Sequence, residues 1–174
     1  METGLTAQKG AKAPEAGRTS SKLLRQLVVF TLADEDYGVD IGTVREIIRI
    51  QTITKVPKTP KFIQGVINLR GKVIPVIDLR KRFDLTAAAT GKDSRIVVID
   101  IDGQDIGVIV DAVTEVLRIP ADSVDPPSSI IASVESEYLL GIAKLASRLI
   151  ILLDLQKVFS NKEITQLSKI PAPH

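Results

Sequence analysis

Cysteine is absent from the 174 residues of this chain, which excludes both a disulfide framework and a thiolate metal site. Histidine occurs once, as His174, in an end that we expect to be frayed and therefore unable to hold a general base in place. No glycine is followed by the Lys-Ser or Lys-Thr pair of a phosphate-binding loop. We therefore expect no catalytic residues, no metal and no cofactor, in a protein that is not an enzyme.

Long apolar runs and an excess of one charge are also missing. No stretch approaches the roughly 20 apolar residues of a membrane span, and no signal-peptide core is visible, so we expect a cytoplasmic protein. The formal net charge is +2, from 23 basic and 21 acidic residues spread along the chain, which argues against nucleic acid as the main partner. Aromatic residues make up only 3%, so the 44% hydrophobic content rests on Ile, Val and Leu and favours β-sheet.

The sequence divides into a folded middle and two loose ends. Residues 1–25 are mostly small or polar with little to bury, which predicts a disordered tail. Residues 26–160 carry most of the apolar side chains and are predicted to form one domain. Residues 161–174 follow a capping signal at Ser160 or Asn161 and place Ile164 and Leu167 at helical spacing, which predicts a C-terminal helix with a frayed end.

The middle of the chain is an internal duplication. Residues 27–50 align without gaps on residues 96–119 with nine identities over 24 positions. Residues 62–83 align on residues 138–159 with seven identities over 22 positions. The two repeats therefore span about 27–83 and 96–159, and the connecting segment is longer in the second, as loops tolerate.

Each repeat has the pattern of a hairpin followed by further short strands. The turns carry Asp and Gly, at Ala33 to Gly38 and Asp102 to Gly107, and the later runs Val73 to Leu79 and Leu149 to Leu155 are apolar almost throughout. Such runs face protein on both sides. The sequence therefore predicts a mainly β fold of two small five-stranded barrels that share an apolar seam, and strands can be exchanged between the barrels.

Features kept in both repeats are expected to serve the shared fold. The paired glycines are predicted to lie at turns or close contacts, and a pair of aspartates is predicted to make structural hydrogen bonds at strand ends. We expect the clustered turn carboxylates to be solvated and to bond the local backbone, because a calcium site needs more oxygen ligands at defined spacing. These residues are Gly38, Gly107, Gly65, Gly141, Asp78, Asp154, Asp34, Glu35, Asp36, Asp100, Asp102 and Asp105.

Differences between the repeats point to function. Asn68-Leu69-Arg70-Gly71 of the first repeat is replaced by Lys144-Leu145-Ala146-Ser147 in the second. An Arg on a rigid turn suits a forked contact with a partner carboxylate, although a solvated loop Arg is the alternative. Glu46 recurs as Glu115, so a local pairing role and a partner contact both stay open for it.

The stretches YGVDIGTVREI, FIQGVINLRGKVIPVIDLR, IGVIVDAVTEVL and EYLLGIAKL resemble the CheW family of bacterial chemotaxis coupling proteins, over about Leu27 to Phe159. The resemblance implies two SH3-like five-stranded barrels with short helices. It also implies an adaptor that couples the cytoplasmic tips of transmembrane chemoreceptors to the regulatory domain of the histidine kinase CheA, within receptor arrays. A kinase would need further regions for phosphotransfer and ATP binding, for which this chain has no room.

The resemblance also implies site residues. Val44, Glu46 and Arg70 are expected to contact the receptor. Gly107, Val113 and Val116 are expected to contact the kinase, although Gly107 has an equivalent in the first repeat and a structural role competes.

Two rival classes of function stay open on the sequence alone. One is a duplicated barrel that binds a small ligand or an anionic polymer between the repeats, through the Arg and Lys side chains at 70, 72, 80, 81 and 82; this class predicts salt-dependent binding. The other is an enzyme that relies on Asp and Arg alone.

Overall fold

The computed structural model describes residues 24–86, 88–126 and 138–158. The predicted tail and C-terminal helix fall outside them, apart from Leu24 and Arg25, which lie in a strand. The strands are β2 (Leu24–Leu32), β3 (Glu35–Asp40), β4 (Val44–Arg49), β5 (Ile63–Leu69), β6 (Lys72–Asp78), β7 (Arg95–Ile101), β8 (Gln104–Val110), β9 (Ala112–Pro120), β10 (Val124–Asp125), β11 (Leu139–Leu145) and β12 (Arg148–Leu153). The helices are η2 (Ile41–Thr43), α1 (Leu79–Arg82), η3 (Ala121–Ser123) and α2 (Leu155–Val158). None of the described helices has the length and hydrophobicity needed to cross a membrane.

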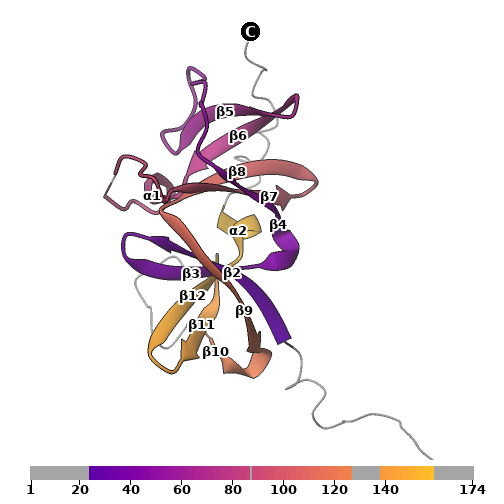
Figure 1. Ribbon diagram of the computed structural model, residues 1–174, viewed down its shortest axis with the longest axis vertical. Coiled ribbons are helices and arrows are strands. Elements are labelled where there is room, and N and C mark those ends of the chain that lie inside the picture. The colour runs from indigo at the N-terminus through magenta and orange to yellow at the C-terminus, as the bar shows by residue number, and fades with distance from the viewer. Residues whose placement is uncertain (1–23, 87, 127–137, 159–174) are drawn as a thin grey trace, which may run out of the picture.

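The strands form two sheets, which are the two predicted barrels. The five-stranded sheet has the order β4-β7-β8-β6-β5, and we call it the first barrel. The six-stranded sheet has the order β10-β11-β12-β3-β2-β9, and we call it the second barrel; its extra strand, β10, is only two residues long. Figure 1 shows the first barrel above the second, with α2 between them.

The two repeats exchange their leading hairpins. The hairpin β2–β3 of the first repeat pairs with β9 and β12 of the second, and the hairpin β7–β8 of the second repeat pairs with β4 and β6 of the first. The registers match under the repeat, since Val28 lies opposite Val116 and its equivalent Val97 lies opposite Ile47. Each barrel is therefore built from both repeats, and neither repeat can close a barrel alone.

The largest apolar cluster lies between the barrels. It holds eighteen buried residues, against six in the interior of each barrel, so the seam is the main core of the molecule. Along β2, Val28 and Phe30 face the seam while Leu27 and Val29 face the barrel interior. Both faces of the exchanged hairpins are thus buried, which explains why the strands have apolar runs rather than alternation.

The repeated glycines lie where another part of the chain comes too close for a side chain. A Cβ on Gly65 would meet the carbonyl oxygen of Thr54 at 2.1 Å, and one on Gly141 would meet that of Asp125 at 2.5 Å. A Cβ on Gly107 would meet the Ile96 side chain at 2.7 Å. These glycines therefore lie at close contacts rather than at turns. Of the segments Ala33–Gly38 and Asp102–Gly107, only the first two residues form the turn, because β3 begins at Glu35 and β8 begins at Gln104.

The repeated aspartates cap the short helices that end the barrels. Asp78 accepts a hydrogen bond from the backbone N–H of Arg80 at 3.0 Å, and Asp154 accepts one from Gln156 at 3.0 Å. A carboxylate that satisfies a free N–H in the first turn stabilises the helix start. The structural role predicted for both aspartates is confirmed.

Gly65→Ala is expected to destabilise the fold by about 2 kcal/mol or more, because the φ of +146° disfavours a side chain and the Cβ would overlap the Thr54 carbonyl. Thermal unfolding followed by circular dichroism measures the effect. Gly91→Ala is the matched control, since a Cβ there meets nothing within 4 Å. Equal melting temperatures for the two variants would contradict the close-contact role of Gly65.

Candidate functional site

One end of each barrel is closed by charged side chains. In the first barrel, Lys72 precedes the interior residues Ile74 and Val76 on alternate positions of β6, and Glu46 precedes Ile48 in the same way on β4. Alternate residues of a strand share one face, so the chain continues each apolar interior row with a charge. We call this end the charged end of the barrel.

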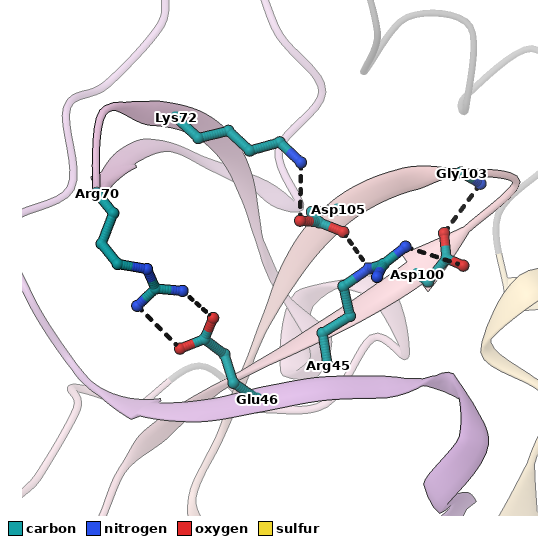
Figure 2. Close-up of polar contacts among 7 residues, drawn as sticks. All are labelled: Arg45, Glu46, Arg70, Lys72, Asp100, Gly103 and Asp105. Atoms are coloured by element: carbon teal, nitrogen blue, oxygen red, sulfur yellow. Dashed lines mark hydrogen bonds and ion pairs between the residues drawn. The ribbon is translucent and has the colours of Figure 1, made fainter.

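Glu46 and Arg70 form a forked ion pair at the charged end of the first barrel. Arg70 donates from Nη1 to Oε1 of Glu46 at 3.3 Å, and its Nη2 lies against Oε2. Figure 2 shows the guanidinium reaching down from the β5–β6 turn to the carboxylate on β4. Hydrogen bonding to Glu46 is the main reason why the pKa of Arg70 is raised above its ordinary value. The pairing role of Glu46 left open by the sequence is therefore observed, over 24 residues of sequence.

The Arg70 side chain is 70% exposed even though it is paired, while that of Glu46 is 32% exposed. Its backbone has a φ of +53°, and Gly71 follows with +85°, as a tight two-residue hairpin turn requires. Asn68 fixes this turn, since its side-chain oxygen accepts a hydrogen bond from the N–H of Gly71 at 2.8 Å. The turn thus presents an exposed guanidinium that has one carboxylate partner, Glu46, among the described residues.

A second set of ion pairs lies beside the first. Asp105 contacts Lys72 at 2.9 Å and Arg45 at 2.5 Å, and Arg45 also reaches Asp100 at 3.3 Å (Figure 2). Arg45 is the extra residue of a β-bulge, because Val44 pairs with Ile99 while Glu46 pairs with the adjacent Val98. Such a bulge redirects the side chain of the unpaired residue. The first barrel therefore places three cations around its charged end.

In the described part of the second barrel, one cation, Arg148, binds the carboxylates at the same end. Arg148, the equivalent of Lys72, donates from Nε to Asp36 at 3.1 Å and from Nη1 to Glu115. Hydrogen bonding to Glu115 is the largest cause of a raised pKa for Arg148. The side chain of Arg148 is 32% exposed and binds two carboxylates of the barrel. That of Arg70 is far more exposed and binds one.

The prediction that all the turn carboxylates are solvated is wrong for two of them. Asp36 and Asp105 are equivalent residues, and each is an ion-pair partner at a charged end; the side chain of Asp105 is only 14% exposed. The local hydrogen bond expected of these residues is observed at Asp100, which accepts from the N–H of Gly103 at 2.9 Å. The sequence does not show which turn carboxylates are covered, because their burial depends on which other strand packs beside the hairpin in the folded chain.

The structure brings Glu46 and Arg70 together, places Val44 near them on β4 but on the opposite face, toward the seam, and separates the kinase candidates. Val44 packs partly buried against the seam, two residues from Glu46 on β4. Val113 packs on the seam in the same way from β9, and Val116 is 52% exposed on that strand. Gly107 is buried in β8 of the first barrel, so packing accounts for it and a contact with a partner stays a prediction.

Four residues of the charged ends were not singled out as site residues from the sequence. They are Arg45, Lys72, Asp105 and Arg148. The repeat contained a usable signal, since Lys72 aligns with Arg148 and Asp36 aligns with Asp105, which keeps opposite charges at two equivalent positions. Ile47 was also missed, although it is the equivalent of Val116 and is 39% exposed.

The basic residues that suggested an anion-binding cleft have other partners. Arg70, Lys72 and Arg80 each contact a carboxylate, and Lys81 donates to the side chain of Gln64 at 2.8 Å. The three ion pairs compensate the charges of Arg70, Lys72 and Arg80, which a polyanion would otherwise attract, whereas the amide of Gln64 leaves the charge of Lys81 in place. Across the described ranges, no group of three or more acidic, His or Cys side chains is arranged to hold a metal ion.

Comparisons with known proteins agree on one family. Residues 26–163 match the family model described as a CheW-like domain. The chemotaxis protein CheW of Klebsiella aerogenes is 33% identical over 86% of this chain and 90% of that protein, and that of Treponema pallidum is 33% identical over 83% and 88%. The crystal structure of the scaffolding protein TtCheW from Thermoanaerobacter tengcongensis is 45% identical, with a TM-score of 0.73 over 81% of this chain and 91% of that one.

Arg148→Ala is expected to lower the melting temperature by about 3 °C or more, because it leaves two partly buried carboxylates side by side without a cation. Arg70→Ala is the matched control and is expected to shift it by no more than about 1 °C, since exposed pairs contribute little. Differential scanning calorimetry of both variants measures this. Equal losses of melting temperature would contradict the view that Arg148 stabilises the fold more than Arg70 does.

Proposed function

This chain belongs to the CheW family, and we propose that it is a non-catalytic adaptor that couples chemoreceptors to the histidine kinase CheA in bacterial chemotaxis. The family assignment supports a scaffold role in chemotaxis. The observation that carries the proposal is the exposed Arg70–Glu46 pair on one barrel and the exposed Val116 on the other. Two surfaces held on one body are what an adaptor needs.

The first barrel supplies the proposed receptor surface. Arg70 is charged, exposed and held on a rigid turn, so it can exchange Glu46 for a carboxylate or carbonyl of the receptor tip at little ordering cost. Glu46 is then free to accept a cation of the partner. Val44 lies two residues before Glu46, with its side chain against the seam, so any receptor contact that it makes is at the edge of this surface.

The second barrel supplies the proposed kinase surface. Val116 has a large exposed fraction on the outer face of β9, and Val113 lies three residues before it, at the border of the seam. A single exposed valine is ordinary on a protein surface, so the family assignment is what favours the regulatory domain of CheA as its partner. Gly107 contributes by keeping β8 tightly packed against β7, which preserves the strand that leads into β9.

We further propose that the protein acts in the cytoplasm and is recruited to membrane-bound receptor arrays. The absence of a spanning helix among the described residues agrees with recruitment through protein contacts. Receptor and kinase surfaces on different barrels allow both partners to bind at once, so ternary assemblies form.

Arg70→Glu is expected to weaken binding to a receptor cytoplasmic fragment by about tenfold or more, since it removes the guanidinium and places a carboxylate beside Glu46. Isothermal titration calorimetry measures the affinity. Arg118→Glu is the matched control, because it makes the same charge change at an exposed site of β9. Unchanged receptor affinity for Arg70→Glu, in a variant with a normal thermal transition, would rule out this surface.

Val116→Glu is expected to weaken binding to the CheA regulatory domain by about tenfold or more, while receptor affinity stays the same. The cost arises because the contact would bury an unpaired carboxylate. Ile47→Glu is the matched control, since it changes the equivalent exposed residue on the first barrel. If both glutamate variants lose kinase binding equally, the kinase surface is not confined to the second barrel.

A further inference from the structure

The chain crosses from the first barrel to the second through a single residue. β8 of the first barrel ends at Val110, β9 of the second begins at Ala112, and Asp111 lies between them. The N–H of Asp111 donates to the carbonyl of Thr31 at 3.0 Å, which ties the crossing to β2. A link of one residue lets β9 leave β8 in a new direction. The angle between β8 and β9 then depends on the contacts that hold Asp111.

The carboxylate of Asp111 is held from both barrels. Arg80 donates from Nε to Oδ1 at 3.0 Å and from Nη2 to Oδ2 at 2.6 Å, and Oδ2 also accepts from the N–H of Ala33 at 2.9 Å. Arg80 belongs to α1, which follows the first barrel's β6, whereas Ala33 lies in the β2–β3 turn of the second. The Nη1 of Arg80 also donates a hydrogen bond to the carbonyl of Thr86 at 2.6 Å. We call this set the crossing clamp.

Arg80 and Asp111 are both ionised near neutral pH, and Arg80 is held in place by its surroundings. The Arg80 side chain is only 17% exposed, and its own backbone N–H is fixed by the capping oxygen of Asp78. Hydrogen bonding to Arg80 is the largest cause holding the pKa of the Asp111 carboxyl below its ordinary value. Paired forks of this kind define orientation as well as distance.

The repeat shows that the fold itself does not demand the clamp. The equivalent of Asp111 is Gly42, and the equivalent of Arg80 is Gln156, so the other crossing lacks the equivalent ion pair. That crossing, from β3 to β4, runs through the short helix η2 instead. A feature required to close either barrel would be present in both repeats, and this one is present in one.

We propose that Arg80 and Asp111 are positioning residues that fix the angle between the two barrels. The seam opposes separation of the barrels, but burial of apolar area is not directional, so it resists sliding less than it resists opening. The forked hydrogen bonds of the clamp are directional, so they oppose sliding of the barrels at the point of crossing. Since Val113 lies two residues beyond Asp111, the clamp also sets the start of the strand that carries the proposed kinase surface.

The consequence for signalling rests on the proposed function. An adaptor transmits a change in the receptor only if the two surfaces move as one body. Weakening the clamp therefore reduces coupling between partners without removing either contact surface.

The absence of cysteine gives a direct test of the angle. Arg49→Cys on β4 and Leu140→Cys on β11 place one spin label on each barrel, and pulsed electron resonance measures the distance distribution between them. Arg80→Lys and Asp111→Asn are expected to broaden this distribution while the chain stays folded. The matched control Lys144→Gln breaks an ion pair within the second barrel, with Asp125 at 2.7 Å, and is expected to leave the width unchanged. An unchanged width in folded Arg80→Lys overturns the proposal.

A reconstituted assembly of receptor fragment, CheA and this protein tests the consequence. Both clamp variants are expected to bind each isolated partner within about twofold of wild type while the receptor-dependent change in kinase rate falls about fivefold or more. Equal losses of affinity and coupling would show that the clamp residues are contact residues and overturn the positioning role. Failure of wild type to bind either partner would refute the proposed function, and the spin-label result would still decide the clamp.

Discussion

Burial of the two exchanged hairpins against each other is the interaction on which the remaining structure depends. β2–β3 and β7–β8 each contribute one face to a barrel interior and the other to the seam between barrels. Neither hairpin completes the barrel of its own repeat, so the repeats fold only together. The seam also fixes β4 and β9, which carry the candidate residues, on either side of it.

The duplication has left the barrels alike inside and different at their charged ends. Both interiors need glycine where strands approach closely and both end strands need a capping aspartate, so these residues are retained in both repeats. The charges at the ends have diverged: Arg148 satisfies two carboxylates, while the first barrel divides the same work between Arg70 and Lys72. This division leaves Arg70 exposed on its turn, where a partner can reach it.

The comparison of the repeats drew attention to Arg70 and Glu46, while the set of candidate site residues came from the family resemblance. The asymmetry at Arg70 was visible in the sequence, and so was the recurrence of Glu46 as Glu115, but their pairing was not. Glu46 and Arg70 are 24 residues apart and meet only because the first barrel closes between β4 and the β5–β6 turn. The roles of Asp36 and Asp105 were misjudged for the same reason, since their cations come from other strands.

The sequence by itself determined the class of fold, the duplication, the apolar seam and the family, because each depends on local composition or on matching segments. Only the tertiary structure decided which hairpin completes which barrel, since either pairing satisfies the same apolar pattern. It alone also brought Arg80 to Asp111 and Arg45 to Asp105. Ion pairs between distant residues depend on strand order and register, and a sequence of short, similar strands does not specify these locally.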